Sequence, residues 1–309
     1  MRARSALFTL FGDVVRPSGG EAWLTALTGA MGALGFTPQA TRTALHRMTT
    51  EGWVEPRRVG RYAAYRLTDR GVDRLEEAAA RIYRLRAADW DGRWRLLIIS
   101  PALAAGNGDL AARRPRGPRD HEFARALGWM GFGRLSTEVW VSPHEHGDRL
   151  SALVADHALV AESLPLLSTT DGADPQAPSA EDRRIVAQAW DLGALREAHA
   201  GFLRAWPVQA PAEQDDPAAA FLHRLRLVHH WRSFLFLDPG LPTALLPDDW
   251  LGGAAAGRFR DLHETASEPA WAWWEELTAT IPAAAPLGTT PQDSPFARGL
   301  DALATRQPA

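Results

Sequence analysis

The chain of 309 residues contains neither cysteine nor lysine. The lack of cysteine excludes disulfides, thiolate zinc sites and cysteine nucleophiles, and it fits a reducing compartment. Every side chain in the combined count of 34 lysines and arginines is therefore an arginine, whose planar guanidinium suits phosphates and guanine edges. A GC-rich genome that prefers arginine codons is the alternative cause, so composition alone does not assign nucleic-acid binding.

Long apolar runs are also missing. No stretch of about 18 apolar residues is present, and residues 1–15 have too short an apolar core, and no small-residue cleavage site, for a signal peptide. We therefore expect a cytoplasmic protein that does not enter a membrane. The apolar fraction of 46%, with 13 Trp and 11 Phe, is sufficient for a sizeable core.

Acidic residues are scarce at one end of the chain. Residues 1–86 contain 14 arginines against 8 acidic residues, a net charge of +6, whereas the remainder contains 20 against 29, a net charge of −9. A basic N-terminal segment in an otherwise acidic chain predicts that a polyanion would bind the first 86 residues.

The first segment predicts three helices. Apolar residues at helical spacing indicate helices over Ala3 to Val15 and Glu21 to Met31. Thr37 then forms an N-cap, Pro38 occupies the first helical position, and Gly52 ends the third helix.

The third helix has two different faces. One carries Thr41, Ala44, Leu45 and Met48, which predicts close packing on another helix. The opposite face contains no acidic residue and consists of Gln39, Arg42, Thr43, His46 and Arg47. In a helix-turn-helix the third helix enters the major groove, where Arg reads guanine and Gln reads adenine.

A predicted hairpin follows this helix. Short strands are expected at Trp53–Val54 and Tyr62–Leu67, with three arginines on the intervening loop: Arg57, Arg58 and Arg61. Asp69 then caps a helix that runs to about Ala87 and closes the segment. Three helices, a β-ribbon and a closing helix describe an N-terminal winged helix-turn-helix domain over residues 1–88, with an ordinary surface helix beside a hairpin as the alternative.

The rest of the chain predicts two further domains, so that the protein is α+β but mainly helical. Residues 89–170 show strand, helix, one or two strands, helix, strand, which suggests a ferredoxin-like middle domain. A Gly/Pro/Asp-rich linker opens a helical C-terminal domain over residues 171–309. Its candidate helices are Arg184 to Leu203, Ala218 to Phe234 and a segment including Ala270 to Leu277. A Pro/Ala-rich tail follows Ile281.

Signs of catalysis are sparse, and we predict no enzyme, metal or cofactor. His144 to Asp148 places two histidines and two acids in five positions, which a loop also produces by chance. Small CRISPR-adaptation nucleases with a ferredoxin-like fold place a metal-binding Asp at the end of the first strand. This chain has Ser100 there, and a neutral hydroxyl does not replace that carboxylate.

One aromatic segment suggests a ligand site. Arg232 lies among apolar residues and must pair with an acid such as Asp238 or meet an anionic ligand. The candidate ligand residues are Trp231, Arg232 and Phe234. Three tryptophans in AWAWWEEL (Trp271, Trp273 and Trp274) form either a ligand wall or helix core.

The chain resembles the PaaX family of bacterial transcriptional repressors, named for control of phenylacetate breakdown. The resemblance is carried by phrases from residue 3 to about 250: ARSALFTLFGDVV, TRTALHRMTTEGWVEPRRVGR, DWDGRWRLLIIS, GFGRLSTEVWVSP, AWDLGALREAH and HHWRSFLFLDPGLPTALLPDDW. It implies the same three-part architecture, a homodimer bound to double-stranded operator DNA, and release by an aryl-CoA thioester such as phenylacetyl-CoA.

One loop, and the function itself, remain open to other interpretations. The arginines of the loop over residues 104–120, including those at 113–119, would meet DNA backbone, a CoA phosphate or only solvent. The alternative functions are a ferredoxin-like metal-dependent nuclease and a protein-interaction module that binds no DNA.

Overall fold

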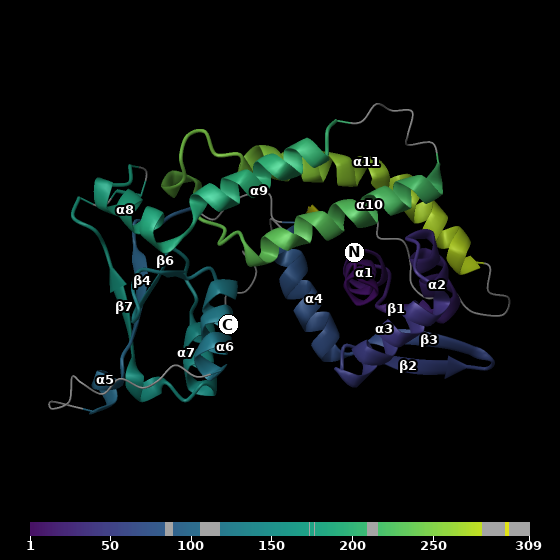
Figure 1. The fold of residues 1–309 in the computed structure, drawn as a ribbon, viewed down its shortest axis with the longest axis horizontal. Coiled ribbons are helices and arrows are strands. Elements are labelled where there is room, and N and C mark those ends of the chain that lie inside the picture. Colours follow the sequence, from purple (N-terminus) through teal and green to yellow (C-terminus); the bar gives the residue numbers. More distant parts are fainter. Residues whose placement is uncertain are drawn as a thin grey trace, which may run out of the picture. The chain divides into compact units, whose positions relative to one another are not determined.

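The computed structural model describes residues 1–83, 89–105, 118–172, 174–175, 177–208, 216–279 and 294–296. The chain divides into two compact units, each assembled from segments far apart in the sequence (Figure 1). The first contains residues 1–85, 200–233 and 252–309, and the second contains residues 86–199 and 234–251. The domain boundaries at residues 88 and 170 stay a prediction.

The first unit begins with alternating helices and strands. Its elements are α1 (Ala3–Leu10), the π-helical η1 (Phe11–Val15), β1 (Glu21–Trp23), α2 (Leu24–Ala33), α3 (Pro38–Thr50), β2 (Val54–Val59), β3 (Tyr62–Leu67) and α4 (Asp69–Ile82). The three strands form an antiparallel sheet in the order β1-β3-β2.

Two details of this segment differ from the sequence prediction. Residues 21–23 form β1, which pairs with β3, so the second helix begins at Leu24. The N-cap of α4 is Thr68, whose hydroxyl accepts a hydrogen bond from the Gly71 N–H, and Asp69 is the first helical residue. The predicted end of this helix near Ala87 lies outside the described residues.

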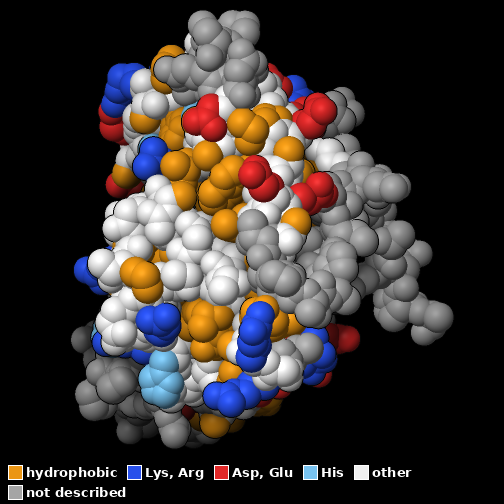
Figure 2. Space-filling view, turned by 90° about the vertical axis from the view of Figure 1, so that its right-hand side faces the viewer, with side chains coloured by type: hydrophobic (Ala, Val, Ile, Leu, Met, Phe, Trp, Pro, Cys, Tyr) orange, Lys and Arg blue, Asp and Glu red, His pale blue; other side chains and the backbone are white. Residues whose placement is uncertain are grey.

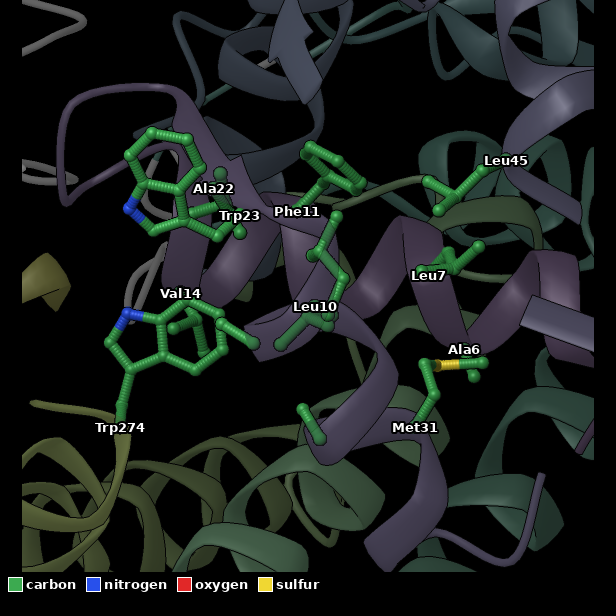
Figure 3. Packing of buried hydrophobic residues seen from close by; sticks show 14 of the residues in the cluster. Ala6, Leu7, Leu10, Phe11, Val14, Ala22, Trp23, Met31, Leu45 and Trp274 are labelled. Carbon is green, nitrogen blue, oxygen red and sulfur yellow. The ribbon is translucent and has the colours of Figure 1, made fainter. Parts of the chain in front are cut away.

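Two helices from late in the chain complete the first unit. α10 (Pro217–Trp231) and α11 (Gly252–Ala279) contact each other, and α11 also contacts α2. The main core joins α1, η1, α2 and α3 with Phe221 and Leu225 of α10 and Trp274 of α11. Figure 3 shows Trp274 beside the apolar side chains of the N-terminal helices. The tryptophan cluster is therefore largely core rather than a ligand wall.

A polar cluster lies inside this apolar unit. The buried carboxylate of Asp13, on η1, accepts hydrogen bonds from Arg224 Nε (2.8 Å) and from the Tyr83 hydroxyl (2.5 Å), and His263 Nε2 lies 3.0 Å away. Burial alone would raise the pKa of Asp13, but Arg224 and His263 hold this pKa far below its usual range. We call Asp13, Tyr83, Arg224 and His263 the Asp13 cluster.

The second unit is built on a four-stranded antiparallel sheet in the order β5-β6-β4-β7. Its elements are β4 (Trp94–Ile99), α5 (Pro101–Ala105), α6 (Pro118–Trp129), β5 (Gly133–Arg134), β6 (Val139–Ser142), α7 (Asp148–Asp156), η2 (Val160–Glu162) and β7 (Ser163–Ser168). This is the predicted order of strand, helix, two strands, helix, strand. Leu97 packs with Phe123 of α6 and Val154 of α7, while Trp94 packs with Val186 in a separate cluster.

The predicted helix over Arg184 to Leu203 is two helices, α8 (Ala180–Ala189) and α9 (Leu192–Ala205). The chain is extended at Trp190 (φ −134°, ψ 142°), and the Asp191 carboxylate accepts a hydrogen bond from the Ala194 N–H (2.9 Å) to start α9. α10 ends at Trp231 and continues as the 3-10 helix η4 (Arg232–Phe236), and η5 (Thr243–Leu245) follows. None of the described helices combines the length and apolar character needed to cross a membrane.

Candidate nucleic-acid interface

The third helix, α3, has the two faces that its sequence predicts. The Thr37 hydroxyl accepts a hydrogen bond from the Ala40 N–H (3.2 Å), and Pro38 follows the cap. Its buried side chains are Thr41, Ala44, Leu45 and Met48. The five candidate side chains are all exposed: Gln39, Arg42, Thr43, His46 and Arg47. Because they share one acid-free helix face, this surface is available to an anionic partner.

The packing of α3 explains why its polar face stays free. Leu45 and Met48 have no exposed surface, and they pack in the core with Leu7 of α1 and Met31 of α2. Between α2 and α3 the chain turns through Gly35, whose φ of +90° is a conformation that glycine adopts without strain. The helix is thereby held by one side only, and its other side faces solvent.

The hairpin of β2 and β3 carries the other three candidate arginines, but not all on its turn. Arg57 and Arg58 lie within β2, and Arg61 follows Gly60 at the turn, so the expectation that all three lie on a loop is wrong. Gly60 has a φ of +60°. All three side chains are exposed.

The three hairpin arginines differ in their partners. Arg57 forms a two-pronged ion pair with Glu21 of β1 (2.5 and 2.9 Å). Arg61 lies over the ring of Tyr62 and donates to its hydroxyl (2.8 Å). Within the described part of the chain, Arg58 makes no ion pair or hydrogen bond, and the same holds for Arg42. Arg42, Arg47 and Arg58 are therefore the candidate arginines that have no described ion pair or side-chain hydrogen bond.

Several acidic residues of the first segment form ion pairs with particular arginines, which a count of charges does not reveal. Arg4 pairs with Glu51, and Arg66 of β3 pairs with Glu55 of β2, so several acids of the first 86 residues neutralise specific arginines. Figure 2 shows arginine and histidine side chains on the lower part of one face, at the height of α3 and the hairpin in Figure 1. The acidic side chains in that view gather mainly on its upper part.

Two of the three candidate ligand residues lie in the first unit. The Trp231 indole N–H donates to the Ile82 carbonyl (2.9 Å), and its ring stacks on Phe259 with centroids 4.9 Å apart. Arg232 Nη1 donates to the Ser5 carbonyl (3.1 Å) and the Thr9 hydroxyl (3.0 Å) of α1.

The predicted ion pair between Arg232 and Asp238 is wrong. Both described partners of Arg232 are neutral, and burial lowers the pKa of its guanidinium. Asp238 instead accepts from the Gly240 N–H (2.7 Å) and lies 3.8 Å from His199 Nε2. The third candidate, Phe234, is buried in the second unit, where its ring stacks on His199 with centroids 4.6 Å apart.

The described residues contain no cluster of three or more His, Asp or Glu side chains that would hold a metal ion. In the His144–Asp148 segment, His146 Nε2 lies 2.9 Å from the Ser142 hydroxyl and its ring stacks on Phe132. Burial and the neighbouring His144 lower the pKa of His146 to about 3. Ser100 follows β4 and donates to the Glu138 carboxylate (3.3 Å).

Family models match three consecutive parts of the chain. Residues 2–71 match a PaaX-like protein, residues 112–181 the central Cas2-like domain of PaaX protein, and residues 190–276 a PaaX-like protein C-terminal domain. The transcriptional repressor PaaX of Escherichia coli (strain K12) is 30% identical over 287 residues, which cover 89% of this chain and 84% of that protein. The chain belongs to the PaaX family.

A solved structure also resembles this PaaX-family chain. The uncharacterized protein Rv0674 from Mycobacterium tuberculosis matches with a TM-score of 0.56 and 23% identity, covering 87% of this chain and 97% of that chain. At this level of identity the likeness concerns the fold. The family membership confirms the resemblance predicted from the sequence phrases.

Proposed function

We propose that the protein is a DNA-binding transcriptional repressor and has no enzymatic activity. The observation that carries the proposal is the exposed, acid-free face of α3, held by its other side on a core shared with α1 and α2. The element order α1-β1-α2-α3-β2-β3 supports a winged helix-turn-helix over residues 1–88. The similarity to a transcriptional repressor over most of the chain supports the same role.

In this proposal two surfaces bind operator DNA in different ways. The exposed face of α3 enters the major groove, where Gln39, Arg42, Thr43, His46 and Arg47 contact base edges and adjacent phosphates. The hairpin holds the flanking backbone or minor groove through Arg58 and Arg61. Arg57 can contact DNA there only after its ion pair with Glu21 breaks, so we expect it to contribute the least to DNA binding of the three hairpin arginines.

We further propose a cytoplasmic homodimer built from a winged-helix domain, a ferredoxin-like middle domain over residues 89–170 and a helical C-terminal domain over residues 171–309. A twofold-symmetric dimer prefers a pseudo-palindromic operator whose half-sites lie about one helical turn, ~10 bp, or a multiple of it apart. Operators with half-sites shifted by roughly half a turn should therefore bind poorly.

The proposed effector is an acyl-CoA thioester, with phenylacetyl-CoA as the first compound to test. Arg232 supports an anionic ligand, because its half-buried guanidinium has two neutral partners and no counter-ion among the described residues. Its partners Ser5 and Thr9 lie on α1, which packs against α3. An anion bound at Arg232 would therefore compete with the hydrogen bonds from Arg232 to α1, and α1 supports the proposed DNA-binding helix α3. Trp231 and Phe234 remain the other proposed effector residues.

Fluorescence-anisotropy titration tests both parts of the proposal. The DNA would come from upstream of the protein's own gene and of neighbouring catabolic genes, at two salt concentrations. Phenylacetyl-CoA would be compared with free CoA as the matched control. Tight DNA binding that weakens as the salt concentration rises supports the repressor role. A further ~10-fold loss of affinity with phenylacetyl-CoA but not with free CoA supports the effector, and it corresponds to ~1.4 kcal/mol of coupling free energy. Absence of sequence-specific binding would refute the repressor role.

The effector part has its own control. If DNA binding is specific but unchanged by phenylacetyl-CoA, the effector proposal fails for that acyl group while the repressor stands. Replacing Arg232 with Gln should remove the thioester response and leave DNA binding without effector within about twofold.

A further inference from the structure

A short segment near the C-terminus places one aromatic ring inside the first unit. The segment consists of Ser294, Pro295 and Phe296, and it comes well after the end of α11 at Ala279. Phe296 is 3% exposed, whereas Ser294 and Pro295 are half-buried. The segment therefore inserts a single ring into the interior and keeps its other two residues partly accessible.

Three aromatic side chains surround this ring, and each meets it nearly edge to face. The centroid of the ring lies 5.3 Å from that of Tyr83, 5.6 Å from that of Phe259 and 5.3 Å from that of His263. The interplanar angles are 87°, 69° and 86°, an arrangement that aromatic pairs prefer at ~4.5–7 Å. We call Tyr83, Phe259 and His263 the aromatic cage.

The contacts that hold the aromatic cage do not involve the C-terminal segment. The Tyr83 hydroxyl donates to the Asp13 carboxylate (2.5 Å), and His263 Nε2 lies 3.0 Å from the same carboxylate. The Phe259 ring stacks on Trp231, with centroids 4.9 Å apart. Because each wall has its own support, we expect the cage to keep its shape when its occupant leaves.

The segment has few other attachments. Among the described residues, its one side-chain hydrogen bond to another element joins the Ser294 hydroxyl to the carboxylate of Glu264, an exposed residue of α11 (3.1 Å). The Phe296 N–H donates to the Ser294 hydroxyl (3.3 Å), which is a contact within the segment. A hydrogen bond at an exposed position contributes little, because water replaces it. The attachment of the segment therefore depends mainly on one ring.

We propose that the aromatic cage binds the arylalkyl group of a small molecule, and that Phe296 is a competitor built into the chain. The side chain of phenylalanine is a benzyl group, so the occupant itself identifies the class of ligand. A ligand with a benzyl group replaces it ring for ring. Its polar part then extends to solvent along the partly accessible path of Ser294 and Pro295. The inference rests on the acyl-CoA effector of the proposed function and specifies where the acyl group binds.

Competition makes the affinity for the ligand depend on the C-terminal segment. The apparent affinity equals the intrinsic affinity multiplied by the fraction of molecules whose cage is empty. The exchange of rings also takes place beside the Asp13 cluster. Asp13 lies on η1, which continues α1, and α1 contacts the proposed DNA-binding helix α3. An arylalkyl ligand in the cage would therefore act on the structure that supports that helix.

Fluorine NMR of the full-length chain tests the displacement. An empty cavity takes up aromatic compounds even where no natural ligand binds, so the decisive measurement keeps the ring at position 296. The probe is 4-fluorophenylalanine at this position alone. We expect saturating phenylacetyl-CoA to move its signal to the value found in a free peptide of residues 291–300, PQDSPFARGL. Acetyl-CoA, which has no ring, should leave the signal unchanged.

Calorimetry measures the competition. We expect Phe296→Ala to bind phenylacetyl-CoA at least ~5-fold more tightly than the wild type, because the competing ring is gone. Phe236→Ala is the matched control: it makes the same substitution at a position of η4 that is 77% exposed, and it should leave the affinity unchanged.

The outcomes separate this inference from the proposed function. A fluorine signal that stays at its buried value while calorimetry shows binding of phenylacetyl-CoA would refute the cage as the site and leave the effector proposal intact. An absence of binding to both the wild type and Phe296→Ala would refute the cage and, for this acyl group, the effector as well. Operator binding measured by anisotropy decides the repressor role independently of both.

Discussion

Arg42 is an exposed arginine on the acid-free face of α3, with no described ion pair. If it reads a guanine edge, the loss of its bidentate contact should cost ~1–3 kcal/mol of binding free energy and relax sequence preference at one position. We therefore expect Arg42→Ala to bind the operator more weakly while binding to unrelated DNA changes little. Arg196→Ala, which removes an arginine paired with Asp249 in the second unit, is the control for changed net charge.

Arg58 should behave differently, because it lies on β2 of the hairpin rather than on α3. A phosphate contact contributes equally to all sequences and releases one counterion. Arg58→Ala should therefore weaken binding to operator and unrelated DNA alike, and reduce the slope of log K against log salt by about one. If Arg42→Ala and Arg58→Ala both bound the operator with the affinity of the wild type, the DNA-binding surface would lie elsewhere.

Asp13 is the acceptor on which the Asp13 cluster depends. It is 3% exposed and pairs with Arg224, which is also 3% exposed. Breaking a buried ion pair from one side leaves an uncompensated charge and costs ~3–5 kcal/mol. Asp13→Asn should lower the free energy of unfolding by about that amount in denaturant titrations, whereas Asp73→Asn, at an exposed position of α4, should change it by less than ~0.5 kcal/mol.

At the scale of elements, the start of α4 is constrained by the backbone of residue 53. A Cβ added at Gly71 would lie 2.3 Å from the Trp53 carbonyl oxygen, whereas one at Gly32 in α2 would meet nothing within 4 Å. Gly71→Ala should therefore move α4 or the hairpin and destabilise the protein by ~1–3 kcal/mol. Gly32→Ala should be neutral or stabilising by up to ~1 kcal/mol. Similar melting temperatures for the two variants would contradict this packing.

α3 was predictable from the sequence because all its determinants are local. The cap at Thr37, Pro38 at the first position and Gly52 after the helix lie within one short stretch, and the apolar residues repeat at helical spacing. β1 was not predictable in the same way. Residues 21–23 are a strand because Trp23 pairs with Ala64 of β3, and that partner is more than forty residues later in the chain.

The break between α8 and α9 is a second feature that the sequence pattern does not predict. Residues 184–203 have a continuous helical pattern, and the only local signal for the break is Asp191, a good cap residue. The candidate site shows the same difference between local features, which the sequence predicts, and long-range contacts, which it does not. The exposed face of α3 was predicted correctly, while the ion pair of Arg57 with Glu21 depends on the order of strands in the sheet.

For the whole molecule, one buried and two half-buried histidines predict how stability depends on pH. Burial lowers the pKa of His146 to about 3 and of His229 to about 4, and it also lowers the pKa of His263. In the unfolded chain each imidazole titrates near ~6.5 and takes up a proton that the folded chain excludes. The free energy of unfolding should therefore fall as the pH is lowered below ~6.5, and Asp13 adds a further loss below ~4.

Denaturant midpoints at pH values of about 7.5 and 5 would measure this loss. His146→Gln should reduce the difference between the two conditions, because one excluded proton is removed. His121→Gln, at an exposed position of α6, should leave the difference unchanged. A stability that is constant over this interval would contradict the neutral state of these histidines.

The largest features of the molecule were out of reach of sequence reasoning. Arg224 donates to Asp13 across 211 positions of sequence, and no local pattern in either segment indicates the other. The first compact unit likewise combines residues 1–85 with residues 200–233 and 252–309, segments that no local pattern links. Such long-range assembly follows from packing complementarity, which residue spacing does not encode.

The shared core of the first unit also sets an order of events during synthesis. α1 and α2 leave the ribosome early, but Trp274, which packs against them, is translated about 190 residues after the end of α4. At ~5–20 residues per second, this interval lasts roughly 10–40 s. Throughout it, the apolar side of the nascent N-terminal helices has no native cover from α11. Codon choice between residues 84 and 274 therefore controls how long chaperones have access to that surface.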